Sequence, residues 1–218
     1  MYNFTFNIPT KIHFGKNTIS NLSELKVYGS KVLLVYGGGS IKKNGLYDTA
    51  MKILKDAGLT VFELSGVEPN PKIETVRKGV EICKNEGIDM VLAIGGGSTI
   101  DCSKVVAAGA RYDGDAWDLV LDGSKVKAAL PIFDVLTLSA TGTEMDPFAV
   151  ISDMSKNEKW GTGSPYMVPT MSILNPEYTF SVSKKQTAAG TADMMSHTME
   201  NYFSMENADC QKFMAEGL

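Results

Sequence analysis

Two short apolar runs, each ending in three glycines and a serine, constrain the fold more than any other feature of this sequence. Residues 31–36 (KVLLVY) precede the turn GGGS at 37–40, and residues 90–94 (MVLAI) precede the turn GGGS at 95–98. A run that is apolar at every position is typical of a strand buried on both faces of a parallel sheet. A glycine turn lets a ligand approach the backbone closely. The pattern therefore predicts two buried strands whose ends can face a ligand.

A helix is predicted to follow the second glycine turn. We expect Ser98 or Thr99 to cap this helix, which carries apolar residues at Ile100, Val105 and Val106. Its free N–H groups and the positive end of its dipole would point at one spot, where a phosphate or pyrophosphate is favoured. Neither turn has the G-x-G-x-x-G spacing of the ordinary dinucleotide fingerprint. For either turn alone, a structural role in helix–strand packing is an open alternative.

Strands and helices alternate along most of the chain, with short turns between them. This alternation predicts parallel strands covered by helices, and ligands of such sheets bind at the carboxyl ends of the strands. Residues 113–122 are interpreted as a polar connector. The expected helices are residues 17–27, 46–57, 73–85 and 186–203, and the further expected strands are residues 60–64, 132–136, 149–151 and 172–174.

The amino-terminal residues alternate between apolar and polar. Residues 3–8 and 11–15 flank Pro9 and Thr10, and this pattern predicts a β-hairpin. A hairpin near a terminus is expected at the edge of a sheet, where a strand can pair with another chain. His13 lies in this hairpin and is interpreted as a structural residue.

The predicted helix at residues 186–203 carries the candidate metal ligands. Asp193, His197 and Glu200 are spaced i, i+4 and i+7, so they share one face of the helix. A carboxylate and an imidazole one turn apart can chelate a metal ion, although such a pair alone is more often a surface contact. Three methionines of the same helix are interpreted as core-filling residues: Met194, Met195 and Met199.

Charge and composition exclude several classes of partner. The net charge is −4 and there is no basic block, which argues against nucleic acid. No apolar run approaches the roughly 20 residues that span a bilayer, and the first residues lack the core of a signal peptide. The three cysteines show no metal-type spacing and are interpreted as reduced thiols. We therefore expect a cytoplasmic protein with no membrane partner.

Five segments, in this order, resemble the iron-containing (family III) alcohol dehydrogenases, particularly their butanol-dehydrogenase branch. They are YGGGSIKKNG at 36–45, PNPKIETVRKG at 69–79, IGGGSTIDCSK at 94–104, TLSATGTEMDPFAVIS at 137–152 and TADMMSHTMENYF at 191–203. The resemblance spans nearly the whole chain. It implies an α/β fold with a parallel-sheet nucleotide-binding domain at residues 1–183, followed at residues 184–218 by the beginning of an all-helical domain.

The resemblance also implies the cofactors and the residues that bind them. The cofactor would be NAD(H) or NADP(H), and the metal would be iron(II) or zinc, held by Asp193 and His197. The remaining implied contacts are Gly96, Gly97 and Ser98 at the pyrophosphate, Gly38, Gly39 and Ser40 near the adenosine, Asp101 facing the nicotinamide, Thr137, Leu138 and Thr141 along the ribose and phosphate path, and Lys159 near the nicotinamide ribose.

The implied reaction is reversible hydride transfer between a small alcohol and an aldehyde, with the metal acting as a Lewis acid. Family habit and the edge hairpin imply a homodimer formed through that hairpin. The sequence departs from the family at Ser139, where the branch often has proline. The family uses one aspartate and three histidines for its metal, whereas only His197 is suitably placed here. Two ligands fall below the usual three, so we expect the front part of a longer enzyme, inactive alone.

Two other functions remain open at this point. The chain could be a nucleotide-binding module without turnover, or belong to a polyol-phosphate dehydrogenase on the same fold; the apolar Met194 and Met195 favour a small unphosphorylated alcohol. NAD and NADP are not separated either. No acidic residue stands in the turn at 37–40 to bind a ribose 2′-hydroxyl, and Lys42 and Lys43 lie nearby.

Overall fold

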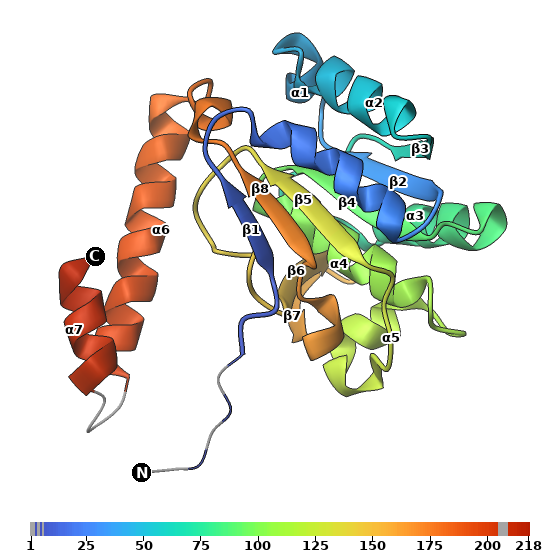
Figure 1. The fold of residues 1–218 in the computed structure, drawn as a ribbon. Helices are drawn as coiled ribbons and strands as arrows, with labels where there is room; N and C mark the ends of the chain where they lie inside the picture. Colours follow the sequence, from blue (N-terminus) through green and yellow to red (C-terminus); the bar gives the residue numbers. More distant parts are fainter. Residues whose placement is uncertain (1–2, 4, 6, 205–208) are drawn as a thin grey trace.

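A six-stranded, all-parallel sheet forms the centre of the computed structural model, which describes residues 3, 5, 7–204 and 209–218 (Figure 1). A separate antiparallel ribbon has two strands, β6 (Phe148–Asp153) and β7 (Glu158–Gly163). The expected α/β class is confirmed. In spatial order, the strands of the main sheet are β1 (Lys11–Phe14), β8 (Met171–Leu174), β5 (Ile132–Leu136), β4 (Met90–Gly95), β2 (Lys31–Tyr36) and β3 (Thr60–Leu64).

Helices cover both faces of the sheet because the central strands are apolar on both sides. In β2, Leu33 packs in one core cluster and the neighbouring Leu34 packs in the other, as the alternation of side chains along a strand requires. The Leu34 face is covered by the 3₁₀ helix η1 (Thr18–Val27), α1 (Ser40–Lys43) and α2 (Leu46–Asp56). The Leu33 face is covered by α3 (Ile73–Glu86), α4 (Gly97–Gly109) and α5 (Ala116–Leu121).

The chain reverses its direction across the sheet between β2 and β4. It leaves β2 through α1 and α2 on one face to reach β3, and then crosses on the opposite face through α3 to reach β4 on the other side of β2. The helices that follow β2 and β4 therefore begin on opposite faces. In open α/β sheets this arrangement leaves a crevice at the carboxyl ends of the two strands, which is the usual place for a ligand.

Two helices, α6 (Lys184–Phe203) and α7 (Asp209–Gly217), follow the sheet and lie side by side, outside the layers that cover it (Figure 1). The helix α6 begins two residues before the predicted start, and the Ser183 hydroxyl accepts a hydrogen bond from the Gln186 N–H at 3.3 Å. Three short 3₁₀ helices complete the described elements: η2 (Gly123–Lys125), η3 (Pro165–Met167) and η4 (Pro176–Thr179). Within the described ranges, no helix has both the length and the apolar character needed to cross a membrane.

The predicted amino-terminal β-hairpin is wrong. Strand β1 is present, but it pairs in parallel with β8, with Lys11 opposite Met171. Of the first predicted strand, residues 3, 5, 7 and 8 belong to no strand, and residues 4 and 6 lie outside the described residues. An alternating pattern indicates which side chains face the interior, but it does not identify the partner strand. Here the partner is β8, which is far from β1 in the sequence. The predicted edge position of residues 11–14 is confirmed.

Two segments were also misread between the main strands. The predicted connector contains α5, whose amino end is capped by the Asp115 carboxylate accepting from the Trp117 N–H at 2.7 Å. Trp117 is buried in the core. The aspartates around it made the segment look like a polar connector, although the helix packs one face against the interior. Residues 158–163, for which no element was predicted, form β7.

Candidate nucleotide and metal site

The two glycine turns lie next to each other at the carboxyl edge of the sheet. Strands β2 and β4 are neighbours in a register that sets Tyr36 opposite Ile94, so residues 37–40 and 95–98 leave the sheet at the same level. The next strand, β5, adds a third turn, because the Thr137 N–H donates to the Gly95 carbonyl at 2.9 Å. The structure thus brings three of the predicted segments to one edge: Gly38, Gly39 and Ser40; Gly96, Gly97 and Ser98; and Thr137, Leu138 and Thr141.

The helix α4 starts without a side-chain cap. Gly96 occupies the N-cap position, and neither Ser98 nor Thr99 caps the helix, contrary to prediction, since both lie within its first turn. The N–H groups of Gly97 and Ser98 have no intrahelical acceptor because they belong to the first turn. A polar cap is dispensable where these donors can serve a ligand, and the dipole of a 13-residue helix favours an anion at this end.

Another segment approaches this glycine turn closely, so a larger residue would crowd it. A Cβ atom on Gly96 would come within 3.2 Å of the Leu138 Cβ atom, and one on Gly97 within 3.2 Å of the Thr141 Oγ1 atom. The segment after β5 therefore rests on the amino end of α4. These glycines therefore do have the packing role that the sequence left open. This role is compatible with the Gly97 and Ser98 N–H groups serving a ligand.

Asp101 is held by the protein on both of its carboxylate oxygens. Its Oδ1 atom accepts from the Thr143 hydroxyl at 2.7 Å, and its Oδ2 atom accepts from the Val150 N–H at 3.0 Å. Burial raises the pKa of the Asp101 carboxyl above its ordinary value, and the Thr143 hydrogen bond opposes this rise. Asp101 therefore ties α4 to residues 143–150, and its predicted contact with the nicotinamide stays a prediction.

Lys104 is a functional candidate that the sequence reasoning missed. Its side chain is fully buried, and its Nζ atom lies 2.8 Å from four oxygens: the Thr143 hydroxyl, the Asp146 carbonyl, the Asp146 carboxylate and the Phe148 carbonyl. The available signal was a lysine inside the otherwise apolar second half of α4. A cation in such a position needs fixed partners, and here residues 143–148 supply them.

Lys159 reaches the same edge of the sheet from β7. Its Nζ atom donates to the Asn70 Oδ1 atom at 2.7 Å, and Asn70 belongs to the loop after β3. That loop starts beside the first glycine turn, where the Gly66 N–H donates to the Gly37 carbonyl at 3.2 Å. Lys159 therefore contacts, through Asn70, the loop that starts beside the first glycine turn.

Lys42, which bears on the choice between NAD and NADP, is already engaged. Its Nζ atom lies 4.5 Å from the centre of the Tyr47 ring and 5.0 Å from that of Tyr36. Both tyrosine hydroxyls donate to the Glu63 carboxylate, at 2.6 Å for Tyr36 and 2.8 Å for Tyr47. This cluster offers Lys42 a cation–π contact and a nearby negative charge.

Asp193 and His197 lie one turn apart on α6, with the Asp193 Oδ1 atom 3.9 Å from the His197 Nε2 atom. Two ligands about 2.1 Å from one ion stand roughly 3–3.5 Å apart, so a small side-chain rotation brings this pair to the spacing of chelation. Their side chains are 43% and 46% exposed, which leaves both accessible to an ion. Within residues 3, 5, 7–204 and 209–218, no third histidine, cysteine, aspartate or glutamate joins them, Glu200 included.

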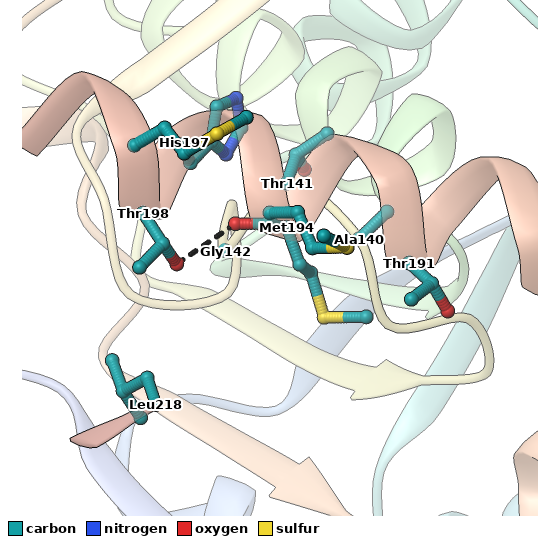
Figure 2. Close-up of a pocket in the computed structure, with 10 residues that line it drawn as sticks. Ala140, Thr141, Gly142, Thr191, Met194, His197, Thr198 and Leu218 are labelled. Carbon is teal, nitrogen blue, oxygen red and sulfur yellow. Dashed lines mark hydrogen bonds between the residues drawn. The ribbon is translucent and has the colours of Figure 1, made fainter. Parts of the chain in front are cut away.

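A cavity of about 760 Å³ separates the segment after β5 from the end of the chain and α6. His197 lines it, and Asp193 does not. Met194, Met195 and Met199 line it too and are 41%, 59% and 50% exposed, so their interpretation as core filling is wrong. Figure 2 shows Ala140, Thr141 and Gly142 near the α6 residues Thr191, Met194, His197 and Thr198, with Leu218 farther off.

Gly190 is the residue at which α6 packs against the segment after β5. It is the buried residue of this otherwise exposed helix, and a Cβ atom added to it would lie 2.9 Å from the Ser139 carbonyl oxygen. Ser139 belongs to the same segment that rests on Gly96. This segment therefore lies between the glycine turn of β4 and the helix that carries Asp193 and His197.

Gly190→Ala is expected to loosen this contact. Alanine favours a helix interior by about 1 kcal/mol over glycine, but its methyl group would collide with a backbone oxygen that cannot rotate away. We expect amide hydrogen exchange at Thr137 and Met145, whose N–H groups donate to the Gly95 and Gly142 carbonyls, to accelerate about tenfold, a change that a helix-propensity effect would not produce. Gly217→Ala in α7, where a Cβ atom meets nothing within 4 Å, is the control. Equal exchange in both variants would contradict the contact.

The sequence of residues 9–176 matches the profile of a family described as "Iron-containing alcohol dehydrogenase". The chain belongs to this family. The match includes both glycine turns, Asp101 and Lys159, and it confirms the resemblance expected from the sequence.

Other members of the iron-containing alcohol dehydrogenase family match the whole chain. It is 60% identical to the NADH-dependent butanol dehydrogenase A of Clostridium acetobutylicum and 39% identical to the NADPH-dependent aldehyde reductase YqhD of Escherichia coli, covering all of this chain and 57% of each relative. The crystal structure of NADH-dependent butanol dehydrogenase A from Thermotoga maritima superimposes with a TM-score of 0.96 at 47% identity, over all of this chain and 55% of that one. The chain thus spans little more than half the length of these relatives.

Proposed function

We propose that this chain is the nucleotide-binding part, at residues 1–183, and the beginning of the metal-binding helical part, at residues 184–218, of an NAD(P)H-dependent oxidoreductase that interconverts an alcohol and an aldehyde. The observation that carries the proposal is the position of the segment after β5. It rests on Gly96 on one side and on Gly190 on the other, so a nucleotide at α4 and a metal on α6 would lie on either side of it.

The residues of the crevice are suited to holding a dinucleotide. The N–H groups of Gly97 and Ser98 would donate to the pyrophosphate, and the dipole of α4 would add a favourable field. Residues 38–40 and the Thr137 and Thr141 hydroxyls border the same edge and would contact the adenosine and ribose portions. NADH and NADPH both remain candidates, because relatives named for each cofactor match this chain.

Asp193 and His197 are the residues that would hold a divalent metal, together with ligands beyond this pair. A carboxylate and an imidazole suit iron(II) or zinc, and their 3.9 Å separation is close to the spacing of two ligands on one ion. When bound, the metal would supply Lewis acidity to the oxygen of the substrate. Among the residues that the structure describes, the adjacent cavity is lined by methionines and by no lysine or arginine, which favours a small unphosphorylated alcohol or aldehyde.

Assembly and location are part of the same proposal. Strand β1 is an edge strand of the main sheet, and an edge strand presents backbone donors and acceptors to another chain. We expect a homodimer that uses β1 without the hairpin first predicted for it. The low net charge and the three free cysteines fit a cytoplasmic enzyme.

The test separates nucleotide binding from metal binding. The 218-residue chain should quench or enhance NADH or NADPH fluorescence saturably without added metal, and it should bind Zn²⁺ with an affinity that His197→Ala lowers about tenfold or more. Glu200→Ala, on the same face of α6, should leave Zn²⁺ binding unchanged. With two metal ligands present, we expect no steady alcohol-dependent NAD(P)H production from this chain alone. The proposal fails if neither nucleotide binds, or if His197→Ala and Glu200→Ala bind Zn²⁺ equally.

A further inference from the structure

Three side chains are joined by hydrogen bonds: Lys104 of α4, Thr143 in the segment after β5, and Asp101, which is again on α4. The Lys104 Nζ atom donates to the Thr143 hydroxyl oxygen at 2.8 Å, and the Thr143 hydroxyl donates to the Asp101 Oδ1 atom at 2.7 Å. Lys104 and Thr143 are 0% and 3% exposed, so both side chains are shielded from water. The hydroxyl of Thr143 is thereby fixed as an acceptor on one side and a donor on the other.

Thr143 also lies close to the glycine turn at which the nucleotide is proposed to bind. A Cβ atom on Gly97 would lie 3.7 Å from the Thr143 Cγ2 atom and 3.2 Å from the Thr141 Oγ1 atom. Moving Thr143 would therefore move the surface that faces the first N–H groups of α4. Lys104 fixes the following residues as well, since its Nζ atom lies 2.8 Å from the carbonyl oxygens of Asp146 and Phe148.

We propose that Lys104 is a positioning residue for the nucleotide site. Acting through Thr143, it fixes the distance between residues 141–143 and Gly97. At this distance a pyrophosphate can reach the amino end of α4, and residues 141–143 form one wall of the site. Lys104 itself lies behind the turn and does not touch the nucleotide. This inference rests on the proposed function, and it adds to it a residue that none of the predicted contacts includes.

A purely structural clamp would have a different signature. If Lys104 and Thr143 only stabilise the fold, removing the Thr143 hydroxyl should lower stability and leave the affinity for NAD(P)H unchanged. If they position the site, affinity should fall even where stability is matched. Thr10 provides a control of matched stability loss, because its buried hydroxyl donates to the Pro169 carbonyl at 2.8 Å. Thr10 precedes β1, so it lies at the amino ends of the parallel strands, whereas the glycine turns lie at their carboxyl ends.

The experiment compares three variants of the 218-residue chain: Thr143→Val, Thr143→Ser and Thr10→Val. For each, NADH and NADPH affinities are measured by fluorescence titration, stability by urea unfolding, and the exposure of the Val150 amide by hydrogen exchange. We expect Thr143→Val to raise the Kd about tenfold and to accelerate exchange at Val150, whose N–H is bound to Asp101. Thr143→Ser, which keeps the hydroxyl, should restore the Kd to within about twofold.

Two outcomes would overturn the inference alone, and a third would overturn the proposed function as well. The inference fails if Thr143→Val binds NAD(P)H as tightly as the unchanged chain, or if Thr10→Val weakens binding as much as Thr143→Val at equal loss of stability. If the unchanged chain binds neither NADH nor NADPH, the proposed function fails, and this inference fails with it.

Discussion

Lys104→Met is expected to lower the free energy of unfolding by about 2–4 kcal/mol, because the substitution removes a buried side-chain cation that lies 2.8 Å from four oxygens. Methionine has a similar volume and creates little cavity, so the loss would come from polar atoms left without a donor. The carbonyls of Asp146 and Phe148 would lose their Lys104 donor, and the Asp146 carboxylate would keep only the Phe148 N–H. That carboxylate is 32% exposed, so water softens part of the penalty.

Urea unfolding of Lys104→Met and of Lys52→Met measures this effect. Lys52 is exposed on α2, so its replacement controls for the change in net charge and for the methionine itself. The control should change stability by less than about 0.5 kcal/mol. A loss below about 1 kcal/mol in Lys104→Met would show that the interior tolerates these oxygens without the ammonium group.

The second large effect concerns Asp134, a fully buried carboxyl in the middle of β5. Its Oδ2 atom lies 2.6 Å from the Ser172 Oγ atom, which lies 2.8 Å from the Glu144 carbonyl oxygen. One hydroxyl has a single proton and cannot donate to both. The arrangement is satisfied if Asp134 is protonated and donates to Ser172, while Ser172 donates to Glu144. Burial raises the pKa of the Asp134 carboxyl well above its ordinary 3.8; the Ser172 hydrogen bond opposes the rise, the Glu144 charge adds to it and the Lys104 charge opposes it.

A carboxyl whose pKa is raised in the folded state makes stability fall as pH rises. Below pH 3.8 both states hold the proton, whereas above it the unfolded chain releases the proton that the folded chain retains. The folded protein should therefore lose about 1.4 kcal/mol per pH unit from this group, until the pH reaches the folded-state pKa.

Asp134→Asn removes this loss, because the amide can donate to Ser172 at every pH. The difference between the unfolding free energies of the variant and the unchanged chain should grow in favour of the variant between pH 5 and pH 7, as measured by urea unfolding at each pH. An infrared carbonyl band of a protonated carboxylic acid at neutral pH should disappear in the variant. Parallel pH profiles for the two proteins would show that Asp134 is ionised in the folded chain.

The strands and turns that position the site could be predicted because local pattern determines them. A run such as residues 90–94, apolar at every position, is typical of a strand in the middle of a parallel sheet, and the glycines after it allow the close approach seen at Leu138 and Thr141. The partner of β1 could not be predicted this way. Strand β1 pairs with β8, and no local pattern in residues 11–14 predicts a partner so distant in the sequence.

The supporting residues of the site were missed for a related reason. Lys104 gains its role only when residues 143–148 fold over α4, and Gly190 only when α6 meets Ser139. Neither relation has a fixed spacing in the sequence. Asp193 and His197 were found because one helical turn separates them, which is a local relation. Their role as metal ligands and the predicted nucleotide contacts remain proposals for the experiments above.

The pairing of β1 with β8 has a consequence for how this protein is made. The residues joined before these strands, Thr10 and Pro169, are 159 positions apart, so a ribosome working at about 5–20 residues per second takes roughly 8–30 s to deliver the second after the first. During that interval β1 has been synthesised and its neighbour has not. The strands β2, β3 and β4 can assemble while translation continues, whereas β1 remains without its partner until β8 has been synthesised. Until β8 is available, the backbone donors and acceptors of β1 have no sheet partner, which is when this strand is most exposed to pairing with another chain.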